Sequence, residues 1–109
     1  MRPIRLSLTA AGVTDPVITD HYRGPFNVGV GVTLSGTATY SVEYTYDDVF
    51  SSAFNPATAQ WFAMSAFPAG TATSKDGAIT TPVMAIRLNA ATLTGTLTMT
   101  VLQAGMPGL

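Results

Sequence analysis

Four segments of the chain alternate between apolar and polar positions, the period that places successive side chains on opposite faces of a β-strand. In residues 93–101 every even position is threonine, while the odd positions are apolar or glycine. Residues 38–46 and 26–34 follow the same period, and residues 4–9 repeat it over a shorter length. A helix would mix the two sets of side chains on each face. The pattern therefore predicts half-buried strands in all four segments.

Short turn-forming sequences separate these segments. Ser-Gly at residues 35–36 lies between two of them, so residues 26–46 are predicted to form a β-hairpin. The Asp-Gly pair within residues 74–77 suits the left-handed backbone of another tight turn. A strand is expected at residues 83–88, since the proline before it is tolerated at the start of a strand. Residues 89–92 would then turn the chain into its final strand.

The segment 47–68 follows neither strand nor helix spacing throughout, and we expect a long connection there. One short strand is predicted near residues 60–64. The alanine-containing sequence also permits a helical turn around residues 57–60. Asn55 would cap that turn, and Pro56 would occupy its first position, where a missing N–H does no harm.

Length and pattern together predict the fold class. A chain of 109 residues fits one domain, whose core can bury about two-thirds of the surface that the unfolded chain exposes. We therefore assign residues 1–109 to a single domain. The alternating strands favour an all-β, antiparallel β-sandwich, with a jelly roll as one topology that it could adopt.

The charge balance excludes several classes of partner. Five basic and six acidic residues give a formal charge of −1, which provides no basic field for nucleic acid or anionic lipid. No window approaches the roughly 18 to 20 apolar residues of a membrane helix, and Ser7 and Thr9 interrupt the run that a signal peptide needs. The absence of cysteine excludes thiolate metal sites and a cysteine nucleophile. We expect no nucleic acid, no membrane and no cofactor.

Few side chains offer catalytic chemistry. His21 is the sole histidine, and Asp15 and Asp20 lie close in sequence, so a base with a carboxylate partner is conceivable. Its neighbours are typical of a loop, where a solvated histidine needs no function, and we favour that interpretation. Asp47 and Asp48 could bind a hard cation, but no further carboxylate stands at calcium-loop spacing, which favours a turn cap. An enzyme is therefore not expected.

Aromatic residues suggest carbohydrate binding as a second class of function. Trp61 together with Tyr40, Tyr44 and Tyr46 could form a stacking platform for sugars. The three tyrosines share a strand face with Val42, so packing in the core explains them better. A carbohydrate-binding β-sandwich module is kept as an alternative.

One stretch of the chain combines aromatic rings with a lack of charge. Residues 49–74 contain no Asp, Glu, Lys or Arg, and charged residues are 10% of the chain against about a quarter in an average protein. Such a stretch suits an interface core, although rings that close the hydrophobic core are the simpler alternative. We predict a contact with another protein molecule, and Arg2 and Arg5 could belong to an N-terminal arm that reaches it or, equally well, to a solvated strand end. The predicted aromatic contact residues are Phe50, Phe54, Trp61, Phe62 and Phe67.

Five stretches of the sequence resemble the small structural proteins of tailed bacteriophages. They are residues 3–9 (PIRLSLT), 23–32 (RGPFNVGVGV), 36–48 (GTATYSVEYTYDD), 85–89 (AIRLN) and 95–105 (GTLTMTVLQAG). These stretches carry strand patterns without a catalytic signature. Proteins of this kind include capsid decoration, or cement, proteins, which are small β-sandwiches or jelly rolls.

The resemblance implies a non-enzymatic virion protein, made in the cytoplasm of a bacterial host and located on the outer capsid surface. Its implied partners are the major capsid protein and copies of itself, as a dimer or a trimer. It would bridge neighbouring shell subunits and stabilise the assembled lattice. Tail and neck accessory proteins of phages have a similar composition, and that location is the alternative.

Overall fold

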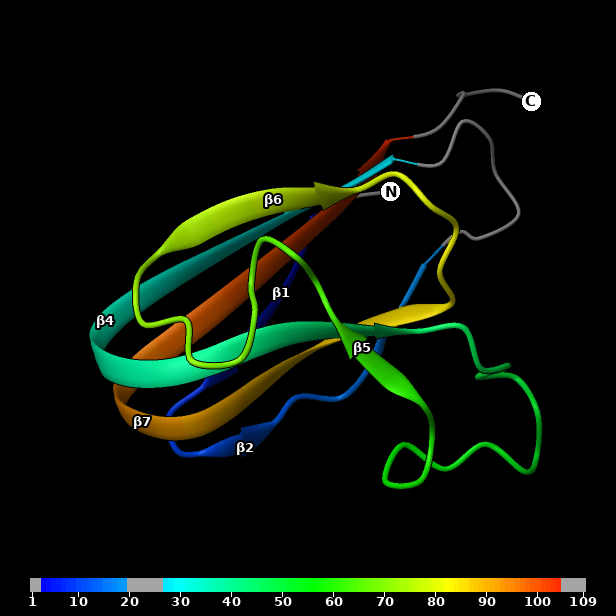
Figure 1. Cartoon of the computed structure of the whole chain (residues 1–109), viewed down its shortest axis with the longest axis horizontal. Coiled ribbons are helices and arrows are strands. Elements are labelled where there is room, and N and C mark those ends of the chain that lie inside the picture. The colour runs from blue at the N-terminus through cyan, green and yellow to red at the C-terminus, as the bar shows by residue number, and fades with distance from the viewer. Residues whose placement is uncertain (1–2, 20–26, 105–109) are drawn as a thin grey trace.

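The computed structural model describes residues 3–19 and 27–104, whose strands all join one antiparallel sheet of seven strands (Figure 1). No helix occurs among these residues. The prediction of an all-β, antiparallel fold is therefore confirmed, and the sandwich and jelly-roll arrangements stay predictions. The strands are β1 (Ile4–Leu8), β2 (Gly12–Val13), β3 (Val17–Ile18), β4 (Asn27–Thr45), β5 (Trp61–Ala63), β6 (Lys75–Ile79) and β7 (Ala85–Ala104).

Two long strands form the centre of the sheet. β4 and β7 pair over their whole lengths, from Asn27 opposite Ala104 to Thr45 opposite Ala85. Both strands bend sharply near the middle, at the left of Figure 1. The predicted hairpin over residues 26–46 is wrong, because the two halves of β4 pair with β7 and not with each other.

Glycine occupies the bend in both strands. Gly36 and Gly95 lie opposite each other, and both have a φ of 112°, a backbone region that residues with a side chain rarely adopt. A Cβ atom on either glycine would overlap a carbonyl oxygen of the opposite strand, that of Thr94 or of Ser35. The Ser-Gly pair at residues 35–36 thus lies at a bend in the paired strands β4 and β7. The sequence pattern predicts a two-residue hairpin loop at the same place.

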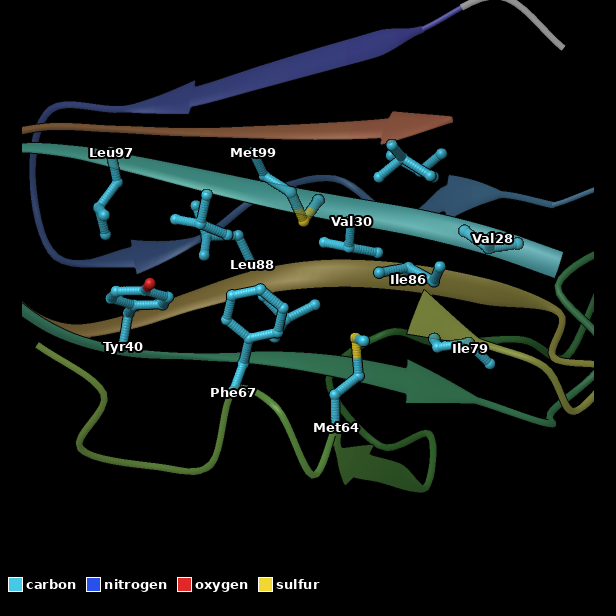
Figure 2. Close-up of a cluster of buried hydrophobic side chains, with 14 of the residues drawn as sticks. Val28, Val30, Tyr40, Met64, Phe67, Ile79, Ile86, Leu88, Leu97 and Met99 are labelled. Atoms are coloured by element: carbon cyan, nitrogen blue, oxygen red, sulfur yellow. The ribbon is translucent and has the colours of Figure 1, made fainter. Parts of the chain in front are cut away.

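The bend divides the sheet into two half-sheets that face each other across the core (Figures 1 and 2). The first half-sheet has the order β1, the C-terminal half of β7, the N-terminal half of β4, and β6. The second half-sheet has the order β2 and β3, the N-terminal half of β7, the C-terminal half of β4, and β5. The buried side chains between them include Val28, Val30, Val32, Leu97, Met99 and Val101 from the first half-sheet and Ala38, Tyr40, Val42, Ile86, Leu88 and Ala90 from the second.

A β-bulge in β7 keeps apolar side chains on the core side of both half-sheets. The register passes from Thr39 opposite Thr92 to Tyr40 opposite Ala90, so one residue of β7 has no partner. Because side chains alternate along a strand, the extra residue changes the inward positions of β7 from even to odd numbers. The predicted turn at residues 89–92 is therefore wrong, and a bulge in a continuous strand stands there instead.

The predicted turn at residues 74–77 is also wrong, since β6 covers most of them and pairs with β4. Gly77 lies opposite Val30, and a Cβ atom on it would be 2.6 Å from the Cβ atom of Ala66. Glycine here allows close packing within a strand. The short strand predicted near residues 60–64 is confirmed by β5.

Tyr40 makes the stability of the fold sensitive to alkaline pH. Its ring is buried, its hydroxyl donates to the carbonyl oxygen of Thr73 at 2.5 Å, and burial raises the pKa of the phenol. As the pH rises, the phenol loses its proton in the unfolded chain before it does so in the folded protein. The contribution of the protonated Tyr40 to the free energy of unfolding is therefore complete below about pH 10 and is lost as the pH rises further. In urea titrations across this range, we expect a smaller alkaline loss of stability for Tyr40→Phe than for the wild type. Equal losses would contradict this origin of the pH dependence.

Candidate contact surface

The connection between β4 and β5 covers the outer face of the second half-sheet. Thr45 and Ala85 point away from the core, yet both are fully buried. The hydroxyl of Thr45 donates to the carbonyl oxygen of Gln60, at 2.8 Å, and so ties the connection to β4. The connection is therefore packed on the sheet, and it positions the aromatic residues that it carries.

The helical turn expected after Asn55 is present as a single turn. The N–H of Ala59 donates to the carbonyl oxygen of Asn55 at 2.8 Å. The side-chain oxygen of Asn55 accepts from the N–H of Ala57 at 3.0 Å, which is the capping role that was predicted for it. Pro56 follows the cap, where its missing N–H is not needed.

Asp47 and Asp48 accept backbone hydrogen bonds, as the turn-cap interpretation predicts. Asp48 Oδ1 accepts from the N–H of Phe50 and Asp47 Oδ2 from the N–H of Gln60, both at 3.0 Å. Together with Phe54, they line an open hollow of about 270 Å³. Among the residues that the structure describes, no group of three or more His, Cys, Asp or Glu could hold a metal ion. His21 and Asp20 lie outside the described residues.

Trp61 holds the connection against the sheet. The guanidinium carbon of Arg87 lies 4.1 Å from the centre of the Trp61 ring, and Arg87 Nε donates to Glu43 Oε1 at 2.8 Å. The indole N–H donates to the carbonyl oxygen of Pro56 at 2.9 Å. The side chains of Arg87 and Glu43 are only 13% and 18% exposed, so solvent screens the ion pair less than it would at the surface. Trp61 therefore contributes to the fold on the outer face of the half-sheet, and its predicted contact with another molecule stays a prediction.

Three rings form an exposed cluster beside β5, which we name the aromatic patch: Tyr44, Tyr46 and Phe62. Tyr44 lies opposite Phe62 in the register, with ring centres 5.9 Å apart. The Tyr46 ring is 5.6 Å from that of Tyr44 and 5.9 Å from that of Phe62, edge-on to both. Tyr46 and Phe62 are 52% and 43% exposed. Two large rings are thus held in fixed positions and remain open to solvent.

A hollow beside the aromatic patch lies between the edges of the two half-sheets. Its volume is about 280 Å³, and it is lined by Tyr44, residues 63–65 and residues 78–81. Burial, and then the neighbouring Tyr46, raises the pKa of Tyr44, so its hydroxyl stays protonated at neutral pH. The hollow could accept a side chain of a molecule that packs on the patch.

The predicted sugar platform is not formed as one surface. Trp61 lies opposite Thr45, whereas Phe62 lies opposite Tyr44, so the indole and the tyrosines project from opposite faces of the half-sheet. Tyr40 is buried in the core, as its strand face predicted. Stacking on a sugar would have to use the aromatic patch without Trp61.

The predicted contact residues have different positions in the structure. Phe67 is fully buried, so its assignment to a contact surface is wrong, and the simpler alternative of core packing holds for this ring. Phe62 is exposed in the aromatic patch, and Phe50 is 66% exposed on the connection. Phe54 is half-buried at the hollow near Asp47. Arg5 is exposed on β1, well separated in the sheet from these rings, so it lies in a paired strand and not in a separate arm.

Arg2 lies outside the described residues, so its place in an N-terminal arm stays a prediction.

The prediction that Tyr46 packs in the core is wrong. Tyr46 continues the alternation of β4, but it lies just beyond the end of that strand and is exposed. Tyr46 is exposed because β4 ends at Thr45, and the alternation of side chains does not show where a strand ends. An adjacent run of polar residues, Asp47-Asp48, was the available sign that the strand ends there.

Comparison of the chain with protein-family models, curated proteins and solved structures finds no match. The described residues include no helix that is long and apolar enough to cross a membrane. A function for the chain is therefore proposed from its own residues and their arrangement.

Proposed function

We propose that this protein is a non-enzymatic virion component that binds the outer capsid lattice as a decoration protein. The observation that carries the proposal is the aromatic patch, in which Tyr46 and Phe62 remain 52% and 43% exposed on a chain with few charged residues. Exposed aromatic clusters with little charge around them are typical of protein contact surfaces. The resemblance of the sequence to small tailed-phage proteins supplies the choice of a capsid as the partner.

The proposed mechanism is adhesive. A protein that binds only the assembled lattice stabilises that state, by about 2.7 kcal/mol per site at a hundredfold excess over its dissociation constant. Phe62 and Tyr46 would act as anchors, since rigid rings lose little conformational entropy on binding. The hollow lined by Tyr44 and residues 78–81 would accept a side chain of the shell protein.

Replacing Phe62 with serine is expected to weaken attachment to capsids assembled without this protein by about 30-fold, the effect of losing an anchor of about 2 kcal/mol. Leu102→Ser is the matched control, because Leu102 is 48% exposed on the first half-sheet, away from the aromatic patch. Cosedimentation across a concentration series measures both variants. Equal attachment of Phe62→Ser and the wild type would show that the patch does not bind the shell.

Carbohydrate binding is the second candidate, and the adjacent rings and hydroxyl groups of the patch favour it. Aromatic faces stack on sugars, and Ser65, Thr80 and Thr81 at the hollow offer hydrogen bonds. Calorimetric titration with a panel of glycans tests this candidate, because Trp61 is not in the patch and its fluorescence would be insensitive. Saturable glycan binding that Phe62→Ser abolishes would favour carbohydrate binding over the decoration role.

A location on the phage tail or neck is the alternative within the virion. Attachment of the protein to isolated tails or necks, and not to shells, would favour that location.

A further inference from the structure

We propose that copies of this chain join head to tail, with β6 of one copy pairing with β1 of the next and extending the first half-sheet. These two strands are the edges of that half-sheet, since within the described residues β1 pairs only with β7 and β6 only with β4. An edge strand presents backbone N–H and C=O groups that a further strand can satisfy. The occupant that fits both edges is a second copy of the chain.

Opposite charges stand at matching positions on the two edges. Arg5 on β1 lies opposite Thr100 of β7, and Asp76 on β6 lies opposite Gly31 of β4. Thr100 and Gly31 are themselves opposite each other, so Arg5 and Asp76 belong to one row across the half-sheet. Both side chains are exposed on its outer face. Among the described residues, neither has an ionic partner.

Strand direction and length permit the pairing. Neighbouring strands in the half-sheet are antiparallel, so β1 and β6 run in opposite directions. A sideways repeat, in which the next copy is displaced in the plane of the sheet across the strand direction, therefore sets its β1 antiparallel to β6 of the first copy. Both strands have 5 residues. If the rows continue across the junction, Asp76 lies opposite Arg5 of the next copy and Gly77 lies opposite Ile4. Opposite charges directly across an antiparallel pair stabilise it, and like charges destabilise it.

The second half-sheet adds an apolar contact at the same junction. Because β4 and β7 run through both half-sheets, β1, β2 and β3 lie on one side of this central pair, and β5 and β6 lie on the other. Ile18 on β3 is 46% exposed, and the register connects it through Ala85 and Thr45 to Trp61 on β5. A sideways repeat sets Ile18 of the next copy beside Trp61. Both half-sheets would then continue from copy to copy.

This contact uses two different surfaces of each molecule, so every copy keeps one free edge for another. Such heterologous contacts build rings when the rotation closes and filaments when it does not. The inference is argued from Arg5 and Asp76, which lie outside the aromatic patch. The same junction would set Val17 of the next copy opposite Phe62, and β6 lines the hollow beside the patch, so a copy seated there would compete with the shell for these residues. The junction also differs from a symmetric dimer, in which β1 or β6 would pair with itself and would place no Arg5 opposite Asp76.

Charge reversal at the two edges tests the junction. Arg5→Glu or Asp76→Arg sets like charges opposite each other and is expected to weaken self-association at least about tenfold at low salt. The double variant Arg5→Glu/Asp76→Arg restores opposite charges and is expected to recover wild-type association. Lys75→Glu is the control. It also reverses a charge on β6, but the residue opposite position 75 in the next copy would be the uncharged Leu6. Sedimentation velocity over a concentration series, with growth of mass beyond the dimer, is the readout.

A wild-type chain that stays monomeric at every concentration would overturn the proposal, as would a double variant that associates as weakly as the single ones. A strictly dimeric wild type would also contradict it. Melting curves check that each variant is folded, since exposed substitutions of this kind change stability by only about 0.5 kcal/mol. Shell attachment of the Asp76→Arg variant, measured separately, distinguishes failure of this junction from failure of the decoration role.

Discussion

Replacing Phe67 with alanine is expected to lower the free energy of unfolding by about 3–5 kcal/mol, the cost of removing a buried aromatic ring and leaving a cavity. The Phe67 side chain is fully buried, with its ring centre 6.2 Å from that of Tyr40. Figure 2 shows it between Tyr40 and Met64, where the segment after β5 closes one side of the core. Two hydrogen bonds join that segment to Val42 of β4, one donated by Met64 N–H and one accepted by the Phe67 carbonyl, so the backbone is held in place and cannot readily fill the cavity.

Phe50→Ala is the matched control for this prediction. The same atoms are removed from a ring that is 66% exposed, and the expected loss is below about 1 kcal/mol. Urea unfolding at neutral pH measures both variants. Similar losses for Phe67→Ala and Phe50→Ala would contradict the assignment of Phe67 to the core and Phe50 to the surface.

Replacing Gly95 with alanine is expected to cost about 3 kcal/mol, the upper end for a residue forced into an unfavourable backbone region. Its φ is 112°, and an added Cβ atom would overlap the carbonyl oxygen of Ser35 in the opposite strand. Neither difficulty can be relieved by a rotamer change, because both involve the backbone. The bend would have to open, and this would separate the facing half-sheets. The melting temperature is expected to fall by at least about 12 °C.

Gly31→Ala provides the comparison, since it lies in β4 with no atom within 4 Å of an added Cβ and without a positive φ. We expect it to change stability by less than about 1 kcal/mol, and a small gain is possible because alanine reduces the entropy of the unfolded chain. Equal melting temperatures for Gly95→Ala and Gly31→Ala would show that the ribbon does not bend at Gly95.

Strand segments could be predicted from the sequence, whereas their partners could not. Alternation is a local property, and residues 38–46 and 93–101 fall almost wholly within β4 and β7. The Ser-Gly pair at residues 35–36 is compatible both with a hairpin loop and with a bend. The choice depends on the pairing of β4 with β7, which is a contact between distant parts of the chain, and Gly36 meets Gly95 only in that register. The same applies to Gly77, which suits a turn by itself but is held in β6 by β4.

The candidate site was predicted in part. Lack of charge and the density of rings pointed to residues 49–74, which contain Phe50 and Phe62 as exposed rings. Composition does not say which ring enters the core, because burial depends on where β5 pairs and on how the following segment returns to the sheet. Phe67 is buried and Phe62 exposed for that reason.

Cosedimentation of the purified protein with capsids assembled without it tests the proposed function most directly, with particle heat stability measured on the same samples. We predict saturable binding at a fixed ratio to the shell subunit and a higher rupture temperature for the decorated particles, because binding only the assembled state stabilises it. An absence of binding to shells, or binding that leaves the rupture temperature unchanged, would contradict the decoration role.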